Sequence, residues 1–154
     1  MWIKESKKDD IDYIASNMRK ADRDEVWASD RCTPLEALTI SYGMSNPCFT
    51  GMDGQTPVAM FGVVPLLENI GSIWLLGTDV ISDSKPISFL RWSKKFFPTL
   101  TKSYDMVCNR VDGRNKVHIK WIKWLGFTFI NEVNHGPDQL PFYEFARLIK
   151  CVDQ

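Results

Sequence analysis

The chain has 154 residues and a mass of 17.7 kDa, a length that fits one domain with one hydrophobic core. Hydrophobic residues make up 44% and charged residues 25%, which excludes a disordered chain. Lysine plus arginine equals aspartate plus glutamate, at 19 each, so the net charge is zero. A nucleic-acid binder normally has a basic excess, so we expect no nucleic-acid partner, although the balance leaves a local basic patch open.

Signals for a metal site, for secretion and for a membrane span are weak. The four cysteines are scattered without a C-x-x-C pair, and there are only two histidines, so no structural zinc site is expected. Polar residues follow the first four positions directly, and the longest apolar run, 57–67, is too short to cross a bilayer. We therefore expect an intracellular protein without a membrane span.

The first elements expected in chain order are a strand over 2–5 and a helix capped by Asp9 or Asp10. The charge run 18–25 is typical of a solvated helix end or loop. Residues 33–36, Thr-Pro-Leu-Glu, carry the strongest local pattern: a threonine cap, a proline in the first turn and a glutamate that completes a capping box. They predict a second helix.

Three strands of an antiparallel meander come next. Apolar segments 48–52 and 57–64 flank Asp53-Gly54, a pair that accepts the positive φ of a tight hairpin turn. A second turn is expected at 69–71, followed by a buried strand over 72–79.

The spacing of apolar residues then becomes helical. Ser84 and Pro86 indicate a helix start, and Pro98 is expected to kink or end that helix. A strand over 105–111 follows. Aromatic residues are abundant here, and most of seven are expected to pack between the two C-terminal helices and the sheet: Trp74, Phe89, Trp92, Phe96, Trp121, Trp124 and Phe127.

The last helix is expected to start at Asn115 and end at Gly126. Strands over 128–130 and 142–149 complete the chain, with a long loop, 134–141, between them. The order β-α-α-β-β-β-α-β-α-β-β predicts a single mixed α/β (α+β) domain over 1–154 with a partly antiparallel sheet.

This element order, together with Asn115 and Leu125-Gly126-Phe127, resembles the Gcn5-related N-acetyltransferase (GNAT) superfamily, in which a helix opening with Asn and closing with Leu-Gly-Phe follows the fifth strand. A closer resemblance is to a bacteriophage family that includes internal virion protein A of short-tailed coliphages. The matching segments lie in the same order along the chain: Pro34–Leu38, Gly54–Val63, Trp74–Asp79, Asn109–Phe127, His135–Pro137 and Leu140–Phe142. This implies a location in the host cytoplasm or the virion.

The resemblance implies that acetyl-coenzyme A lies between splayed fourth and fifth strands, with its pyrophosphate on the N-terminus of the next helix. Asp79 would take the proton of an incoming amine, although a turn or cap role is the alternative. For Asn115 and His118 the alternatives are helix capping and packing. The coenzyme-binding residues implied are Leu76, Gly77, Thr78, Val80, Ser84, Lys85, Ser88, Asn109, Asn115 and His118.

Two departures from the superfamily pattern leave two functions open. The phosphate-binding glycine loop is absent, and Ile122 replaces a tyrosine that often protonates the departing thiolate. The first hypothesis is a phage N-acetyltransferase that moves acetyl from acetyl-coenzyme A to an amine of a host protein or another acceptor. The alternative is a catalytically inactive phage assembly or host-interaction protein with the same fold.

Overall fold

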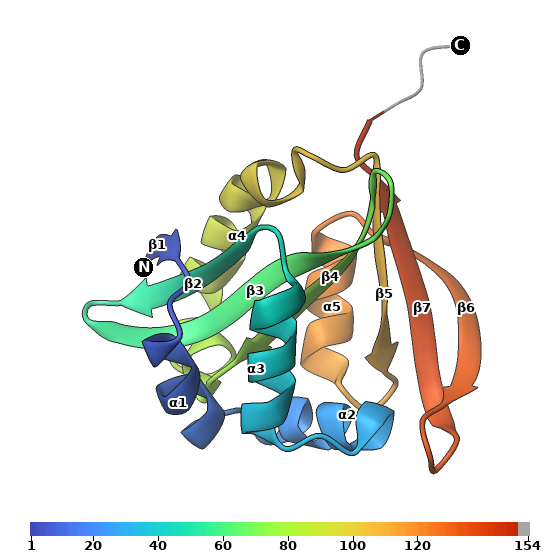
Figure 1. Cartoon of the computed structure of the whole chain (residues 1–154), viewed down its shortest axis with the longest axis horizontal. Helices are drawn as coiled ribbons and strands as arrows, with labels where there is room; N and C mark the ends of the chain where they lie inside the picture. The colour runs from blue at the N-terminus through green and yellow to red at the C-terminus, as the bar shows by residue number, and fades with distance from the viewer. Residues whose placement is uncertain (151–154) are drawn as a thin grey trace.

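The computed structural model describes residues 1–150. Seven strands form one sheet in the order β1-β2-β3-β4-β5-β7-β6 (Figure 1). All neighbouring strands are antiparallel except β4 and β5. The elements are β1 Trp2–Glu5, α1 Asp9–Ser16, α2 Lys20–Asp30, α3 Pro34–Met44, β2 Cys48–Asp53, β3 Thr56–Leu67, β4 Ile70–Gly77, a 3-10 turn η1 Asp79–Ile81, α4 Pro86–Thr101, β5 Met106–Asp112, α5 Lys116–Trp124, β6 Thr128–His135 and β7 Leu140–Leu148.

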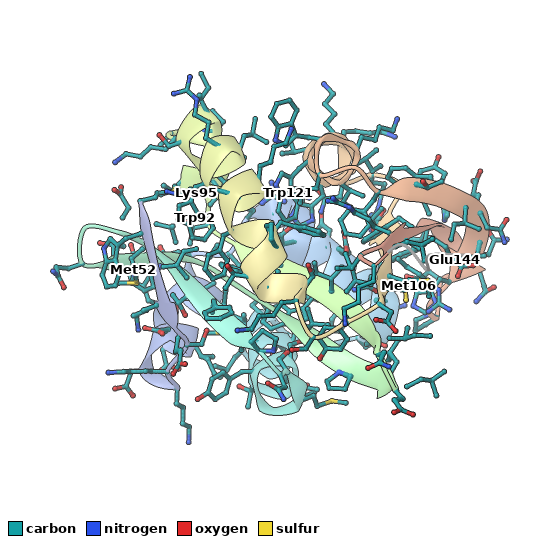
Figure 2. The ribbon with its side chains drawn as sticks, turned by 90° about the horizontal axis from the view of Figure 1, so that it is seen from above. Met52, Trp92, Lys95, Met106, Trp121 and Glu144 are labelled. Atoms are coloured by element: carbon teal, nitrogen blue, oxygen red, sulfur yellow. The ribbon has the colours of Figure 1, made fainter. Side chains whose placement is uncertain are left out.

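Helices cover both faces of the sheet. Helices α4 and α5 lie on one face, and α1 and α3 lie on the other (Figure 2). Helix α2 lies at the end of the sheet where β4 finishes (Figure 1). No helix among residues 1–150 is long and apolar enough to span a membrane.

Several local predictions are confirmed. Thr33 caps α3 by accepting a hydrogen bond from the Glu36 amide at 3.2 Å. Gly54 takes a φ of 58° in the β2–β3 turn, a conformation that costs glycine little. Asn115 caps α5, and Gly126 follows its end with a φ of 83°. Mixed α/β architecture with a parallel β4–β5 pair is also confirmed.

Three local predictions differ in part from the structure. Pro98 does not end α4, which continues to Thr101 because the buried side chains of Phe97 and Leu100 hold the helix to the sheet on either side of the proline. The expected loop 134–141 is half strand, since β6 and β7 extend into it and leave only residues 136–139 as a turn between them. The charge run 18–25 is mostly a helix, α2, with Asp22 buried on it.

Two predicted helix caps are also wrong. The residue before α1 is Lys8, so Asp9 and Asp10 lie inside the first turn. The residue before α4 is Lys85, and Ser84 makes no cap hydrogen bond. Helix α4 nevertheless starts at Pro86, as predicted, whereas α1 starts at Asp9, before the position that a cap at Asp9 or Asp10 implies.

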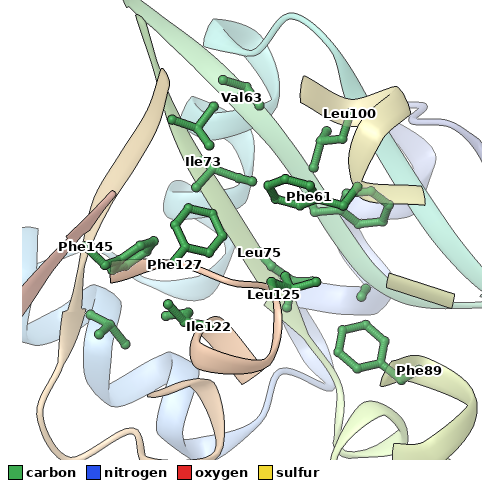
Figure 3. Packing of buried hydrophobic residues seen from close by; sticks show 14 of the residues in the cluster. Phe61, Val63, Ile73, Leu75, Phe89, Leu100, Ile122, Leu125, Phe127 and Phe145 are labelled. Atoms are coloured by element: carbon green, nitrogen blue, oxygen red, sulfur yellow. The ribbon is translucent and has the colours of Figure 1, made fainter. Parts of the chain in front are cut away.

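The hydrophobic core has two parts. The larger lies between the sheet and helices α4 and α5 (Figure 3); there Phe127 packs edge-on against Phe97 and Phe145. Five of the seven expected aromatics belong to it, namely Phe89, Trp92, Phe96, Trp121 and Phe127. Trp74 instead packs with the smaller cluster under α1 and α3, and Trp124 is 50% exposed.

Candidate functional site

The β4 and β5 strands form a fork. They pair only over Ile70–Ser72 and Met106–Cys108. At the next residue the side-chain amide of Asn109 donates to the Ile73 carbonyl at 2.7 Å, so a side chain replaces the backbone ladder where the strands begin to separate. The predicted splay is therefore present, and it begins at Asn109.

A cavity of about 570 Å³ lies at this fork. Its volume is within the range of small-molecule sites. Strands β4, β5 and β7 and helices α2, α3 and α5 all contribute to its lining. Apolar lining residues include Ile73, Leu75, Val111, Ile122 and Phe145, and polar ones include Glu25, Ser29, Asn109, His118 and His135.

The register of β3 and β4 determines which backbone groups face the fork. The Thr78 amide donates to the Val58 carbonyl at 2.9 Å, and Gly77 lies opposite Ala59. In an antiparallel ladder this alternation directs the peptide groups of every second residue away from the partner strand. Leu75 and Gly77 therefore face the fork, while Leu76 and Thr78, two of the predicted coenzyme contacts, direct their amides toward β3.

Both backbone groups of Gly77 that face the fork are already hydrogen-bonded within the chain. The Arg19 amide donates to the Gly77 carbonyl at 2.9 Å, and the Gly77 amide donates to Asp22 Oδ2 at 3.0 Å. Arg19 and Asp22 also form an ion pair at 2.6 Å, with side chains only 4% and 1% exposed. Among residues 1–150, Leu75 is left as the fork-facing residue without such a partner.

The Arg19–Asp22 pair reaches across the fork to the first turn of α5. Asn115 Nδ2 lies 3.3 Å from Asp22 Oδ1, and Arg19 Nη2 lies 3.4 Å from Asn115 Oδ1. His118 Nδ1 is 3.8 Å from the same Asp22 oxygen. The ion pair thus lies among Gly77, Asn115 and His118, three residues predicted to hold the coenzyme.

Burial changes the protonation of the groups around Asp22. It raises the pKa of Glu25 to about 8, with the Asp22 charge adding to the effect, although Glu25 also accepts a 2.9 Å hydrogen bond from Asn115. Burial lowers the pKa of His118 to about 4, and among the described residues its Nε2 atom has no hydrogen-bond partner. At neutral pH the cavity wall therefore presents a mostly protonated Glu25 and a neutral His118.

Asp22 itself stays ionised. Its burial acts to raise its pKa. The charge that His118 carries at acid pH, the charge of Arg19 and the hydrogen bonds from Arg19 and the Gly77 amide outweigh burial and lower the pKa. The site therefore holds a fixed negative charge at Asp22, paired with Arg19, beside two groups that burial keeps neutral.

The remaining predicted residues lie away from the cavity lining. The carbonyls of Asp79 and Val80 accept from the Asp83 and Lys85 amides, both at 2.8 Å, which closes the turn before α4. Lys85 forms a 2.7 Å ion pair with Asp53. The two predicted serines at this helix start, Ser84 and Ser88, are exposed.

The opposite side of the fork is closed by direct contact between α4 and α5. Phe89 and Trp121 have ring centroids 5.4 Å apart, and Trp121 Nε1 donates to Ser93 Oγ at 3.0 Å. Figure 2 shows Trp121 between these helices. Of these aromatic side chains, Trp121 lines the cavity.

Sequence reasoning missed Arg19, Asp22 and Glu25, because a charge run normally indicates a solvated surface. One feature of the run distinguishes these three. They recur every three residues, so they share one face of a helix. That face is directed at the fork.

Comparison with known proteins gives a clear answer for the fold. No family model matches the chain, and no curated protein matches it. An N-acetyltransferase from Staphylococcus aureus Mu50 has a TM-score of 0.73 at 13% identity, covering 97% of this chain and 98% of that one. A ribosomal-protein-alanine N-acetyltransferase from Brucella melitensis has a TM-score of 0.72 at 10% identity, covering 97% and 100%.

A Salmonella typhimurium structure, named as an acetyltransferase with its cofactor acetyl-CoA, has a TM-score of 0.71 at 12% identity. The match covers 100% of this chain and 96% of that one. The chain therefore has the fold of GNAT N-acetyltransferases along its whole described length. At these identities the likeness establishes the fold, and the site itself must support any function.

Proposed function

We propose that this chain is an N-acetyltransferase that moves an acetyl group from acetyl-coenzyme A to an amine. The single observation that carries this is the fork, where the Leu75 peptide group, free of β3 and β5, faces a 570 Å³ cavity. A backbone amide in this position is suited to stabilise the negative charge that develops on an acyl oxygen. The phage resemblance supports a phage gene and an amine of a host protein as acceptor.

The residues present fit the acyl end of acetyl-coenzyme A. Leu75 offers its amide, and Ile122 and Phe145 supply an apolar surface. When bound, the coenzyme supplies an activated thioester. The coenzyme arm would have to follow the β4 edge past Gly77, whose amide and carbonyl are bonded to Asp22 and Arg19, so the ion pair must move for the arm to bind.

The proton released by the amine has a candidate acceptor in Glu25. It lines the cavity. Burial raises its pKa to about 8, so Glu25 is mostly protonated at neutral pH, and the ionised fraction that accepts the proton grows as pH rises toward 8. Asn115 positions the carboxylate through a 2.9 Å hydrogen bond. In this assignment Glu25 replaces Asp79, which lies outside the cavity lining.

A second function is favoured by one specific observation. The Arg19–Asp22 pair occupies the position between Gly77 and Asn115 and is almost completely buried. A chain that no longer binds the coenzyme would have no need to keep this position open. The second candidate is therefore a catalytically inactive protein of the same fold that acts in phage assembly or host interaction.

Calorimetry with acetyl-coenzyme A and with coenzyme A separates the two functions. The enzyme predicts measurable heat at millimolar ligand and release of thiol when an amine is added. Absence of heat and of thermal shift with both ligands would reject the enzyme and favour the inactive protein. Glu25→Gln should keep binding and lose most of the thiol release, because the amide cannot accept the proton.

A reversible lock tests whether the Arg19 segment must move. Met18 and Thr78 are bridge partners, and the Cα atoms of such partners lie within the range that a disulfide spans. If the enzyme proposal is correct, Met18→Cys/Thr78→Cys should lose coenzyme binding when oxidised and regain it when reduced. The reduced form is the matched control, because it carries the same substitutions.

Lys85 gives an independent test of the phosphate position. Lys85→Glu should weaken coenzyme binding about tenfold or more, while Asp53→Asn should strengthen it, because Lys85 then loses its ion-pair partner. Equal affinity in both variants would show that the phosphates bind elsewhere.

A further inference from the structure

Helices α4 and α5 concentrate positive charge in a molecule with no net charge. Residues 84–104 and 113–131 contain no acidic residue. Leaving aside Lys85, which pairs with Asp53, and Arg114, which pairs with Asp112, seven cationic residues remain on these helices or directly after α4. They are Arg91, Lys94, Lys95, Lys102, Lys116, Lys120 and Lys123, and all are exposed.

Helical geometry places these seven residues on the outer face. At about 100° per residue, Arg91, Lys95 and Lys102 lie within about 40° of one another around the α4 axis, opposite the buried side chains of Phe89 and Phe97. Figure 2 shows Lys95 on the outside of α4. The three lysines of α5 are spaced i, i+4, i+7, so they form a second stripe, directed away from buried Ile122.

The two stripes lie side by side. Trp121 of α5 bonds Ser93 of α4, and the Lys94 Nζ atom lies 4.4 Å from the ring centroid of Trp124. The Trp124 side chain, 50% exposed, therefore lies between the stripes with part of its ring open to solvent. The resulting surface, the α4–α5 basic face, is defined by these seven cations and Trp124.

No residue of this face has an anionic partner within residues 1–150. The salt bridges there involve other cations: Lys4, Arg19, Lys20, Arg31, Lys85, Arg114, His118 and Lys150. Uncompensated charges of one sign on a single face add to a local potential that attracts a polyanion. A net charge of zero conceals this field, because the acidic residues lie on other elements.

We propose that the α4–α5 basic face binds the phosphate backbone of a nucleic acid. Lysines in two rows neutralise phosphates, and an exposed indole offers a surface on which an unpaired base stacks. An anionic membrane fits less well, since the apolar sides of both helices are directed into the core and Trp124 is the one aromatic of the face available for insertion. This surface is separate from the proposed acetyl-transfer cavity and does not depend on it.

The test is fluorescence anisotropy of a labelled 20-nucleotide single strand and its duplex, titrated with the full chain at about 50 and 200 mM salt. The variant Lys95→Glu/Lys120→Glu reverses one charge in each stripe. Its matched control, Lys7→Glu/Lys8→Glu, makes the same change of net charge at two exposed lysines near α1. Unchanged thermal unfolding checks that both variants fold.

We expect the wild type and the control to bind at low salt, with affinity falling as salt rises, and the Lys95/Lys120 variant to bind at least about tenfold more weakly. Trp124→Ala should reduce affinity for the single strand more than for the duplex. The proposal is overturned if the wild type does not bind at about 50 mM salt, or if both double variants lose the same affinity. Binding to phosphatidylserine vesicles without binding to either oligonucleotide would also overturn it.

Discussion

Two buried polar networks lie on either side of β4, and they differ in how completely their groups are satisfied. In the first, the Asp10 carboxylate accepts from Lys4 at 2.7 Å, from the Lys7 amide at 2.9 Å and from Thr50 at 3.0 Å. Burial acts to raise the pKa of Asp10, but these hydrogen bonds outweigh it and lower the pKa. This network joins β1, α1 and β2 and borders no described cavity.

The second network, around Asp22, contains groups that the fold leaves in an unfavourable state. Glu25 has a raised pKa, His118 has a lowered pKa, and His118 Nε2 lacks a partner. These groups line the cavity at the fork. Perturbed ionisation beside a cavity is typical of functional sites, whereas a satisfied ion pair is typical of structural ones. The comparison therefore favours a purely structural role for the Asp10 network. It supports the proposed role of the cavity-lining groups Glu25 and His118, while the buried Arg19–Asp22 pair beside them also contributes to stability.

The largest expected effect is on folding stability when each aspartate is removed. Asp22→Ala should cost about 3–5 kcal/mol, because it leaves Arg19 charged and buried without its partner. Asp10→Ala should cost about 1–3 kcal/mol, since Lys4 is 23% exposed and regains water. Urea unfolding of the two variants measures the difference.

A compensating variant sharpens this result. Arg19→Met/Asp22→Leu replaces the buried pair with apolar side chains and should recover most of the stability lost in Asp22→Ala. Equal losses for Asp22→Ala and Asp10→Ala would show that the two networks do not differ in burial cost.

The next effect concerns Asn115, which caps α5 and also bonds Glu25 and Asp22. Asn115→Ala should cost about 2–3 kcal/mol, more than the roughly 1 kcal/mol typical of a lost cap. Thr33→Ala is the matched control, because Thr33 caps α3 without a buried network. If the two variants unfold at the same urea concentration, the Asn115 bonds to Glu25 and Asp22 contribute nothing.

A third effect is a pH dependence of stability specific to the Asp22 network. Because the folded-state pKa of Glu25 is about 8, against its ordinary value of 4.5, unfolding releases its proton, and stability falls as pH rises through that range. The folded-state pKa of His118 is about 4, against its ordinary value of 6.5. Its contribution to stability therefore rises with pH between 4 and 6.5, and in that range it opposes the loss from Glu25. From pH 6.5 to 8 only the Glu25 loss remains, at most about 2 kcal/mol.

Glu25→Gln should remove the loss between pH 6.5 and 8 and expose the rise between pH 4 and 6.5. Asp10 has a lowered pKa, so its contribution is lost only as pH falls below its usual value of 3.8. Thermal unfolding across pH 4–9 compares the wild type with the variant. A wild-type curve that stays flat above pH 6.5 would contradict the raised pKa of Glu25.

Sequence patterns predicted the fold well because they depend on local geometry. The Asp53-Gly54 turn, the Thr33 and Asn115 caps and the splay after Cys108 follow from spacing or from the GNAT resemblance. The Asp22 network was not predicted, because its members Arg19, Asp22 and Glu25 come within an exposed-looking charge run. Only the tertiary contacts of this segment with Gly77, Asn115 and His118 decide which of those charges are buried.

The smallest effect is expected at Lys4, the exposed member of the Asp10 network. Lys4→Met removes the ion pair with Asp10 but leaves the carboxylate its hydrogen bonds from Thr50 and the Lys7 amide. A partly solvated pair contributes about 1 kcal/mol or less, and this contribution should shrink further in high salt. Urea unfolding at low and high salt measures it, with Lys20→Met, which removes the exposed Lys20–Asp24 pair, as the reference for a surface interaction. A loss near that of Asp22→Ala would mean that Asp10 depends on Lys4 as strongly as Asp22 depends on Arg19. The two networks would then not differ in how strongly each aspartate depends on its cationic partner.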